Sequence, residues 1–224
     1  MMLYAFEKAI DLSHHLRNGM PVYPGDPSPS FESFRSLEKD GVNLTKLVMG
    51  SHTGTHIDAP RHFILGGIGI DQIPPAKLIG EAYVADFSDK PVGSGITDAD
   101  LQAFEERIAP DEIVACYTGC SEHWNEDRIR SNYTYLTAEA AEYLVSKKVR
   151  AVGIDFLSVE RFKAAKPIVH RTLLGNGIFI IESLSSALKQ FVGTRILMIC
   201  MPVKLKDGDG APSRVIGVPI EKGS

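Results

Sequence analysis

The segment SHTGTHIDAPRHF, residues 51–63, gathers side chains that bind metals and transfer protons. It contains His52, His56, Asp58 and His62, although the whole chain has only 7 histidines. Two histidines and a carboxylate that leave coordination positions open are the ligand set of catalytic zinc, iron and manganese sites. The residue types therefore indicate metal-dependent catalysis, with a loop of solvated histidines as the alternative.

The spacing within this segment limits how these side chains can converge. Gly54 and Pro60 disfavour a helix, which argues against the HExxH type of zinc site. The four residues are all even-numbered, so in an extended chain their side chains point to the same face. A bend at each breaker would bring the first two histidines and Asp58 round one ion. His62 lies further along the chain and is better placed as a proton-transfer group.

A second pair of such side chains lies far away in the sequence, in HRTLLGNGIFIIES. It begins at His170 and includes Glu182, which follows an apolar run. A carboxylate in an apolar strand is costly unless a metal or a counter-charge compensates it. His170 and Glu182 could therefore complete a second metal site, with Asp58 bridging the two ions. The alternatives are a loop histidine at His170, and a Glu182 that ends the strand at the surface and caps the next helix.

The remaining histidines are weaker candidates. His14 and His15 are the next ligand candidates, but adjacent residues in an extended chain face opposite ways. His123 stands beside Trp124 in a polar segment, where it could contact a substrate or simply lie at the surface.

The elements that must position these residues are strands mixed with helices. Short β-branched or aromatic segments bounded by breakers predict strands at 81–87, 112–118, 149–155, 177–183 and 195–200. Thr97, with Asp100 as its capping-box partner, and Thr137 predict helices over 98–108 and 138–148. A third helix is predicted over 183–192, and segment 20–30, MPVYPGDPSPS, predicts irregular backbone. This pattern predicts an α/β fold.

Composition excludes several classes of function. The chain has 224 residues, 44% of them hydrophobic, which predicts a single domain of residues 1–224 with one substantial core. A net charge of -4 without a basic run argues against nucleic acid as a partner. We find neither an apolar run that would span a membrane nor a signal-peptide pattern. Cys116, Cys120 and Cys200 predict free, buried thiols in a reducing cytoplasm.

The motif HTGTHIDAPRH resembles the HxGTHxDxPxH signature of the cyclase family of metal-dependent hydrolases, which includes bacterial kynurenine formamidase and isatin hydrolase. Further family blocks resemble DLSHHLRNGMPVYPGD, YTGCSEHW, LTAEAAEYLVSKKVRAVGIDFLSVE and HRTLLGNGIFIIESL, in the same order. The resemblance covers nearly the whole chain. It implies a mixed, barrel-like β core flanked by helices, of the swivelling β/β/α type, and a homodimer.

The resemblance also implies which residues bind metal. The family's ligand positions fall on two groups that share one carboxylate: His52, His56 and Asp58, and Asp58, His170 and Glu182. His62 matches the proton donor and acceptor. The implied cofactor is a divalent metal, zinc as one or two ions, with manganese as the alternative.

The activity implied is hydrolysis of an amide C–N bond in a small molecule by metal-activated water, with His62 as the proton shuttle. The substrate would be an N-formyl arylamine or a cyclic aryl amide. Two departures from the family pattern alter the predicted substrate wall: Tyr23 stands where formamidases carry tryptophan, and Cys120 replaces another bulky aromatic residue. The alternatives are a hydrolase or cyclase of a non-aromatic cyclic amide or lactone, and a non-catalytic metal-binding module. No GxSxG motif supports a serine nucleophile.

Overall fold

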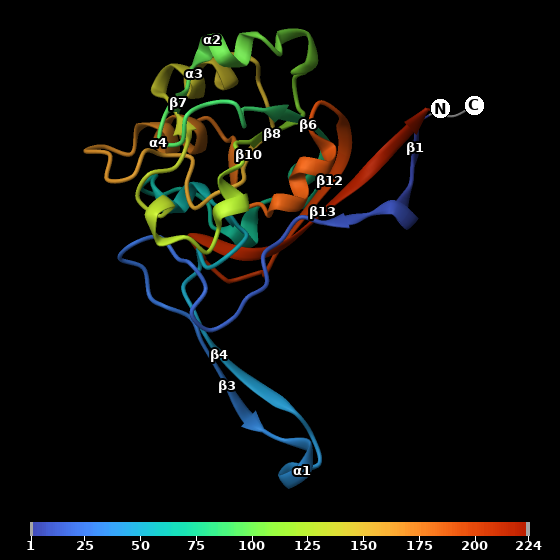
Figure 1. The fold of residues 1–224 in the computed structure, drawn as a ribbon, viewed down its shortest axis with the longest axis vertical. Helices are drawn as coiled ribbons and strands as arrows, with labels where there is room; N and C mark the ends of the chain where they lie inside the picture. Colours follow the sequence, from blue (N-terminus) through green and yellow to red (C-terminus); the bar gives the residue numbers. More distant parts are fainter. Residues whose placement is uncertain (1, 223–224) are drawn as a thin grey trace.

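The computed structural model, which describes residues 2–222, is built round a closed ring of strands (Figure 1). The ring strands pair in the order β13-β12-β6-β8-β10-β11-β5, and β5 pairs again with β13. The pairings β6–β8, β8–β10 and β10–β11 are parallel and the others are antiparallel. The predicted α/β fold with a mixed, barrel-like core is confirmed. Residues 1, 223 and 224 of the predicted 1–224 domain lie outside the described residues.

Five of the ring strands have bounds close to those predicted, whereas β5 and β13 were not predicted. The ring strands are β5 (His56–Asp58), β6 (Ile79–Asp86), β8 (Ile113–Tyr117), β10 (Ala151–Ile154), β11 (Phe179–Glu182), β12 (Arg195–Pro202) and β13 (Gly210–Lys222). The short strands β1 (Met2–Tyr4) and β2 (Ile10–Asp11) pair with β13, and β7 (Gly95–Ile96) pairs with β9 (Tyr135–Leu136).

Alternating side chains of the ring strands fill two separate cores. In β6, Ala82 and Val84 belong to the core inside the ring, whereas Tyr83 and Ala85 belong to the core beneath the helices. This is the two-residue period of a strand whose faces are both covered. β8 is buried along its whole length, which explains why its sequence is continuously apolar.

Three helices cover the ring on the side of β6, β8, β10 and β11: α2 (Asp98–Gln102), α3 (Ala138–Ser146) and α4 (Ile168–Gly175). The predicted caps are confirmed, since Thr97 Oγ1 accepts from the Asp100 amide at 3.2 Å and Thr137 Oγ1 from the Ala140 amide at 3.2 Å.

Two of the predicted helices differ from the structure. The α-helix after Thr97 ends at Gln102, because Phe104 leaves the helical path and packs on Tyr83 and Phe87. Segment 183–192 contains a 3₁₀ helix, Ser186–Phe191, in place of the predicted α-helix. Its core residues Leu188 and Phe191 are three apart, and the three-residue turn of a 3₁₀ helix puts both on one side.

A two-stranded hairpin projects from the ring (Figure 1). It consists of β3 (Ser30–Arg35), the short α1 (Leu37–Asp40) and β4 (Leu44–Val48), and its strands are antiparallel. We call residues 30–48 the arm. The sequence interpretation predicted no element here, and only segment 20–29 before it is irregular as expected.

Two further expectations can be compared with the structure. Cys116, Cys120 and Cys200 are buried and free, as predicted. Among the described residues, no helix combines the length and the apolar character needed to cross a membrane.

Candidate metal centre and active site

The histidine segment bends twice, as its breakers predict. Gly54 has a φ of 69°, which turns the chain before β5, and Pro60 begins a 3₁₀ turn that ends at His62. Only residues 56–58 are a strand. Positive φ is readily adopted by glycine, and proline suits the first position of a helical turn. The two bends therefore fold the segment back on itself.

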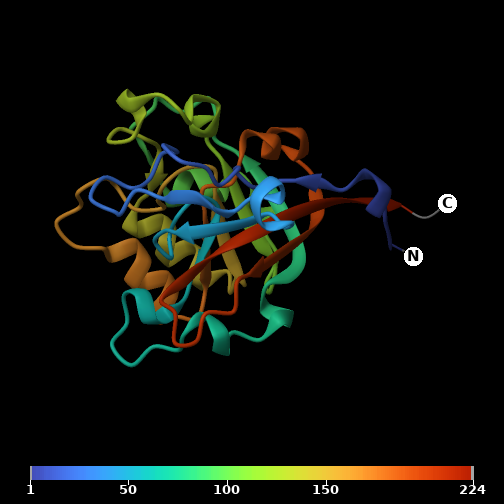
Figure 2. The ribbon, with the colours of Figure 1, turned by 90° about the horizontal axis from the view of Figure 1, so that it is seen from below.

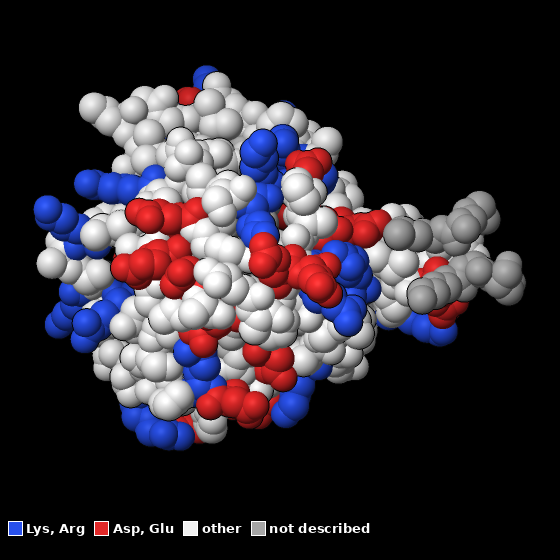
Figure 3. Space-filling model, turned by 90° about the horizontal axis from the view of Figure 1, so that it is seen from above, with Lys and Arg blue, Asp and Glu red and all other residues white. Residues whose placement is uncertain are grey.

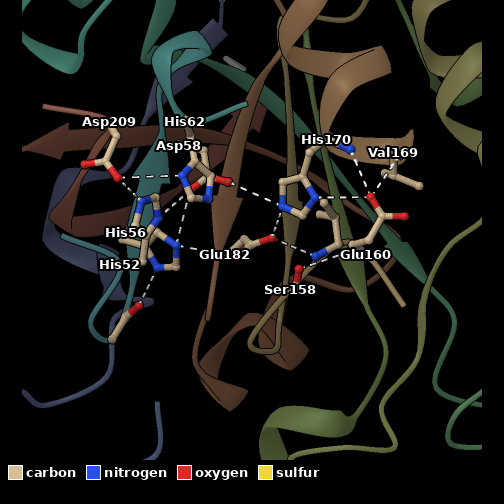
Figure 4. Close-up of polar contacts among 12 residues, drawn as sticks. His52, His56, Asp58, His62, Ser158, Glu160, Val169, His170, Glu182 and Asp209 are labelled. Carbon is tan, nitrogen blue, oxygen red and sulfur yellow. Dashed lines mark hydrogen bonds and ion pairs between the residues drawn. The ribbon is translucent and has the colours of Figure 1, made fainter. Parts of the chain in front are cut away.

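The bends bring the first group of candidate ligands together (Figure 4). His52 Nδ1 lies 2.9 Å from Asp58 Oδ1, and His56 Nε2 lies 3.3 Å from the same oxygen. The three ligand atoms lie within 4.8 Å of one another. Such separations suit atoms that share one metal ion at bond lengths of about 2.0–2.2 Å.

The second group forms on the other oxygen of Asp58. His170 Nε2, from α4, lies 3.6 Å from Asp58 Oδ2 and 3.3 Å from Glu182 Oε1. Glu182 is directly opposite His56 in the β11–β5 pairing and is only 4% exposed. The structure thus brings together all five predicted ligands, with Asp58 between the two groups. It also excludes the alternatives of a surface Glu182 and a loop position for His170.

An oxygen holds the outer ring nitrogen of each ligand histidine. His56 Nδ1 donates to the Gly54 carbonyl at 2.8 Å, and His170 Nδ1 lies 3.3 Å from Glu160 Oε2. His52 Nε2 lies 3.1 Å from Asp209 Oδ2. Such contacts fix the tautomer and the orientation of the imidazole, and they almost always accompany metal-binding histidines.

The cluster contains two buried carboxylates, Asp58 and Glu182, whose negative charges need a nearby positive charge. Burial alone would lower the pKa of His56, but the Asp58 and Glu182 carboxylates, 3.3 and 3.5 Å from its Nε2, outweigh it and raise that pKa to about 10. The pKa of His170 rises to about 10 as well, because its contacts with Glu160 and Glu182 outweigh its burial. Two buried carboxylates this close stay ionised only beside positive charge.

Two orphaned atoms mark where such a cation would bind. In the described part of the chain, His56 Nε2 and Asp58 Oδ2 are buried and have no hydrogen-bond partner. Buried polar atoms without a partner are costly, and both point into the ligand cluster. Imidazole nitrogens and carboxylate oxygens suit zinc and manganese. The residues present therefore fit a divalent metal.

His62 lies beside the ligands and is less enclosed. Its ring stacks on His52 with 4.0 Å between centroids, and its Nδ1 lies 3.6 Å from Asp209 Oδ2. Burial lowers its pKa, which keeps the ring neutral near pH 7 and able to accept a proton. His52, His62 and Asp209 could also hold an ion between them, so geometry alone leaves His62 either role.

A cavity of about 380 Å³ opens onto these side chains. His52, His56, His62, His170 and Glu182 line one part of it, and Tyr23 lies in its wall. This volume is in the range of small-molecule sites. Cys120 does not line this cavity, because it is fully buried in the cluster against which Tyr23 packs. Of the residues that form or pack against this cluster, Tyr23 and Leu157 line the cavity, so Cys120 could influence a substrate only indirectly.

The weaker histidine candidates lie elsewhere. His14 stacks on Trp124 with 3.8 Å between ring centroids, and burial lowers its pKa to about 4. His15 lines a different cavity together with His14. His123 Nδ1 pairs with Glu126 at 2.7 Å. None of the three joins the ligand groups found among the described residues.

Sequence reasoning missed Asp209 and Glu160. Asp209 lies in the Gly-Asp-Gly turn that leads into β13, and a Cβ on Gly210 would approach His52 Cε1 to 2.6 Å. A polar glycine-rich turn directly before an apolar strand was the available signal. Glu160 gave no local signal, because the histidine that it contacts is ten residues away on α4.

Comparison with known proteins gives matches that span the chain. A family model described as "Putative cyclase" matches residues 10–161. The kynurenine formamidase of Bacillus cereus is 31% identical over 212 residues, which cover 94% of this chain and 97% of that protein. A solved structure described as a potential metal-dependent hydrolase with cyclase activity is 31% identical, with a TM-score of 0.80 and coverage of 97% and 98%. Isatin hydrolase A from Labrenzia aggregata, bound to benzyl benzoate, is 25% identical, with a TM-score of 0.86 and coverage of 94% and 93%.

Proposed function

This chain belongs to the cyclase family, and on that premise we propose that it is a metal-dependent hydrolase that cleaves the C–N bond of an aryl formamide or a cyclic aryl amide. The observation that carries the proposal is the pair of ligand groups that share Asp58 and open, beside His62, onto one cavity. A non-catalytic metal-binding module would have no use for such a cavity or for a neutral histidine at its edge.

We propose zinc as the metal, in one or two ions, with manganese as the alternative. His52, His56 and Asp58 would hold the first ion, and Asp58, His170 and Glu182 would hold the second. A metal bound there would lower the pKa of its water from about 15.7 towards about 7 and polarise the substrate carbonyl.

His62 is proposed to move the protons of the reaction. Its Nδ1 faces Asp209, which leaves Nε2 free to exchange a proton within the cavity. Because burial lowers its pKa, the ring starts neutral and accepts a proton as water adds to the carbonyl. The same nitrogen then donates that proton to the leaving nitrogen. An aniline-type nitrogen leaves more easily than an alkyl amine, which suits a site with one proton shuttle.

The rest of the cavity wall indicates the kind of substrate. Tyr23 lines the cavity with an aromatic side chain, and its hydroxyl accepts from the Lys163 amide at 3.4 Å. Arg161 and Lys163 line the same cavity and are exposed. An aromatic amide with an anionic substituent would therefore find a stacking partner and a cation together.

We also propose that the protein acts in the cytoplasm and as a homodimer. The three free, buried cysteines support a reducing compartment. The arm supports self-association, because its apolar side chains Phe34, Leu37 and Leu47 are 62%, 64% and 57% exposed.

The test couples metal analysis to a substrate panel. Purified protein should contain zinc or manganese, should lose hydrolysis on chelation, and should regain it when metal is restored. The panel contains N-formylkynurenine, isatin and simple lactones, and we expect the aryl amides to be hydrolysed fastest. Undiminished hydrolysis by metal-free protein would contradict the mechanism, and a preference for lactones would favour the non-aromatic alternative.

A further inference from the structure

A third group of candidate ligands lies beside the two groups that share Asp58. Asp209 Oδ2 is 3.1 Å from His52 Nε2 and 3.6 Å from His62 Nδ1, and the three donor atoms lie within 4.8 Å of one another. Donor atoms bound tetrahedrally to zinc at about 2.0–2.1 Å are about 3.3–3.4 Å apart. A divalent ion therefore fits between these three atoms with little movement of the side chains.

The backbone fixes the position of Asp209 beside the two histidines. Its carbonyl accepts from the Ala59 amide at 2.9 Å, and the Gly208 carbonyl accepts from the Ile70 amide at 2.9 Å. Figure 2 shows the turn before β13, in red, beside the segment that follows β5, in teal. The turn that carries the carboxylate and the segment that carries His62 are therefore tied together on both sides of Asp209.

This third group is more open to solvent than the buried ligands. The exposed fractions of its side chains are 16% for His52, 27% for His62 and 45% for Asp209, against 1% for Asp58 and 6% for Glu182. Both histidines line the cavity, whereas Asp209 is not among its lining residues. An ion in this group could therefore exchange with solvent while the buried ions stay bound.

An ion in this group would prevent His62 from acting as a base. A neutral imidazole has one nitrogen with a hydrogen and one with a lone pair. If a metal takes the lone pair of His62 Nδ1, the hydrogen resides on Nε2, which then has no lone pair for a proton from the attacking water. The charge of the ion also opposes formation of an imidazolium. Proton transfer would stop, although substrate could still enter the cavity (Figure 4).

We propose that His62, Asp209 and His52 form a third, weaker metal site through which excess zinc inhibits the enzyme. His62 Nδ1 and the Asp209 carboxylate bind the ion, and His52 Nε2 joins them by losing its hydrogen to solvent. The ion is weaker than the resident ones because its single carboxylate is partly exposed and because the neighbouring cations repel it. The inference rests on the proposed function, since it describes regulation of the same site.

Equilibrium dialysis against zinc tests the site without turnover. Metal-loaded wild type should bind one equivalent of zinc beyond its resident ions. His62→Phe, which keeps an aromatic ring beside His52 but removes Nδ1, should keep the resident ions and lose the extra equivalent. Asp209→Asn should weaken binding of the extra equivalent at least about tenfold.

A matched control excludes binding at the protein surface. Glu126 pairs with His123 at 2.7 Å, and both side chains are more than 40% exposed, so this pair could also attract zinc. Glu126→Gln should leave the extra equivalent unchanged. The face of the molecule in Figure 3 has acidic and basic side chains interspersed, so that face offers no acidic patch to compete for the ion.

Kinetics on the same samples test the inhibition. As the extra equivalent binds, kcat for the best aryl amide should fall about 10²–10⁴-fold, the range expected for loss of a general acid or base, while KM stays within about twofold. In Asp209→Asn the same fall should need at least about tenfold more free zinc.

Four outcomes would overturn the proposal. They are no extra equivalent in wild type, an extra equivalent that His62→Phe retains, one that Glu126→Gln loses, and one that leaves kcat unchanged. Because dialysis needs no turnover, a protein that binds all of these ions but hydrolyses none of the panel would count against the proposed function and not against the third site.

Discussion

Replacement of Glu160 by glutamine should lower the affinity for the metal ion proposed at Asp58, His170 and Glu182. The affinity for the other proposed ion should stay unchanged. Glu160 Oε2 lies 3.3 Å from His170 Nδ1 and also accepts from the backbone amides of Val169 and His170, at 2.9 and 3.3 Å. Glutamine keeps the shape and one acceptor oxygen but loses the charge. Hydrogen bonds to a charged group contribute about 1 kcal/mol more than neutral ones. Loss of an outer partner typically costs 10–100-fold in metal affinity, and for this conservative change we expect about tenfold.

The assay is titration of metal-free protein with zinc against a chromophoric chelator, which resolves two binding steps. Only the step assigned to Asp58, His170 and Glu182 should weaken in Glu160→Gln. The matched control is Glu126→Gln, because Glu126 also pairs with a histidine nitrogen, at 2.7 Å, but far from the metal ligands. Equal weakening of both steps, or no change in either, would refute the idea that Glu160 orients His170. Thermal unfolding of the metal-free variants shows whether an effect is merely structural.

Three further substitutions test other parts of the site and the core. His62→Ala should keep its bound metal and lose about 10²–10⁴-fold in kcat, and loss of stoichiometric metal would instead make His62 a ligand. Asp209→Asn should lower the affinity for the ion proposed at His52 about tenfold and leave the affinity for the other ion unchanged. The same zinc titration would measure both. The pKa of His14 is about 4 when folded, against an ordinary 6.5, so the unfolded chain binds more protons between these values. Stability should thus fall by up to about 3 kcal/mol as pH drops from 6.5 to 4, and His14→Phe, which keeps the stack on Trp124, should flatten this slope in urea unfolding.

Residue type and spacing predicted that the first group of candidate ligands would converge, because its residues are local. His52, His56 and Asp58 lie in one segment, and Gly54 and Pro60 fix the bends that gather them. The second group depends on partners far apart in the chain, and the cost of an apolar strand carrying Glu182 gave the only physical signal. Here the sequence left a surface role open, and only the ring shows that Glu182 is buried opposite His56.

The fold was predictable where a segment's own residues decide its structure. Thr97 and Thr137 cap their helices from within the first turn, and β8 is apolar because both of its faces are covered. The sequence predictions were wrong or incomplete where packing against distant residues determines the local structure. Segment 183–192 looks helical, but Leu188 and Phe191 must both reach the core inside the ring, which selects a 3₁₀ helix. The arm was not predicted, because its strands carry polar and apolar residues on both faces and therefore lack a simple alternation of the two.

The strand that closes the ring is also the strand that carries the ligands. β5 has only three residues and lies between β11 and β13, with His56 opposite Glu182 and Asp58 opposite Gly210. Because side chains alternate along a strand, a slip of one residue in either pairing would turn His56 and Asp58 away from their partners. So short a strand gains little from its own hydrogen bonds, whereas a metal bound by the proposed ligands from β5, α4 and β11 would tie three segments together. If a metal binds there as proposed, its binding would stabilise the closed ring, and closure of the ring would in turn assemble its ligands.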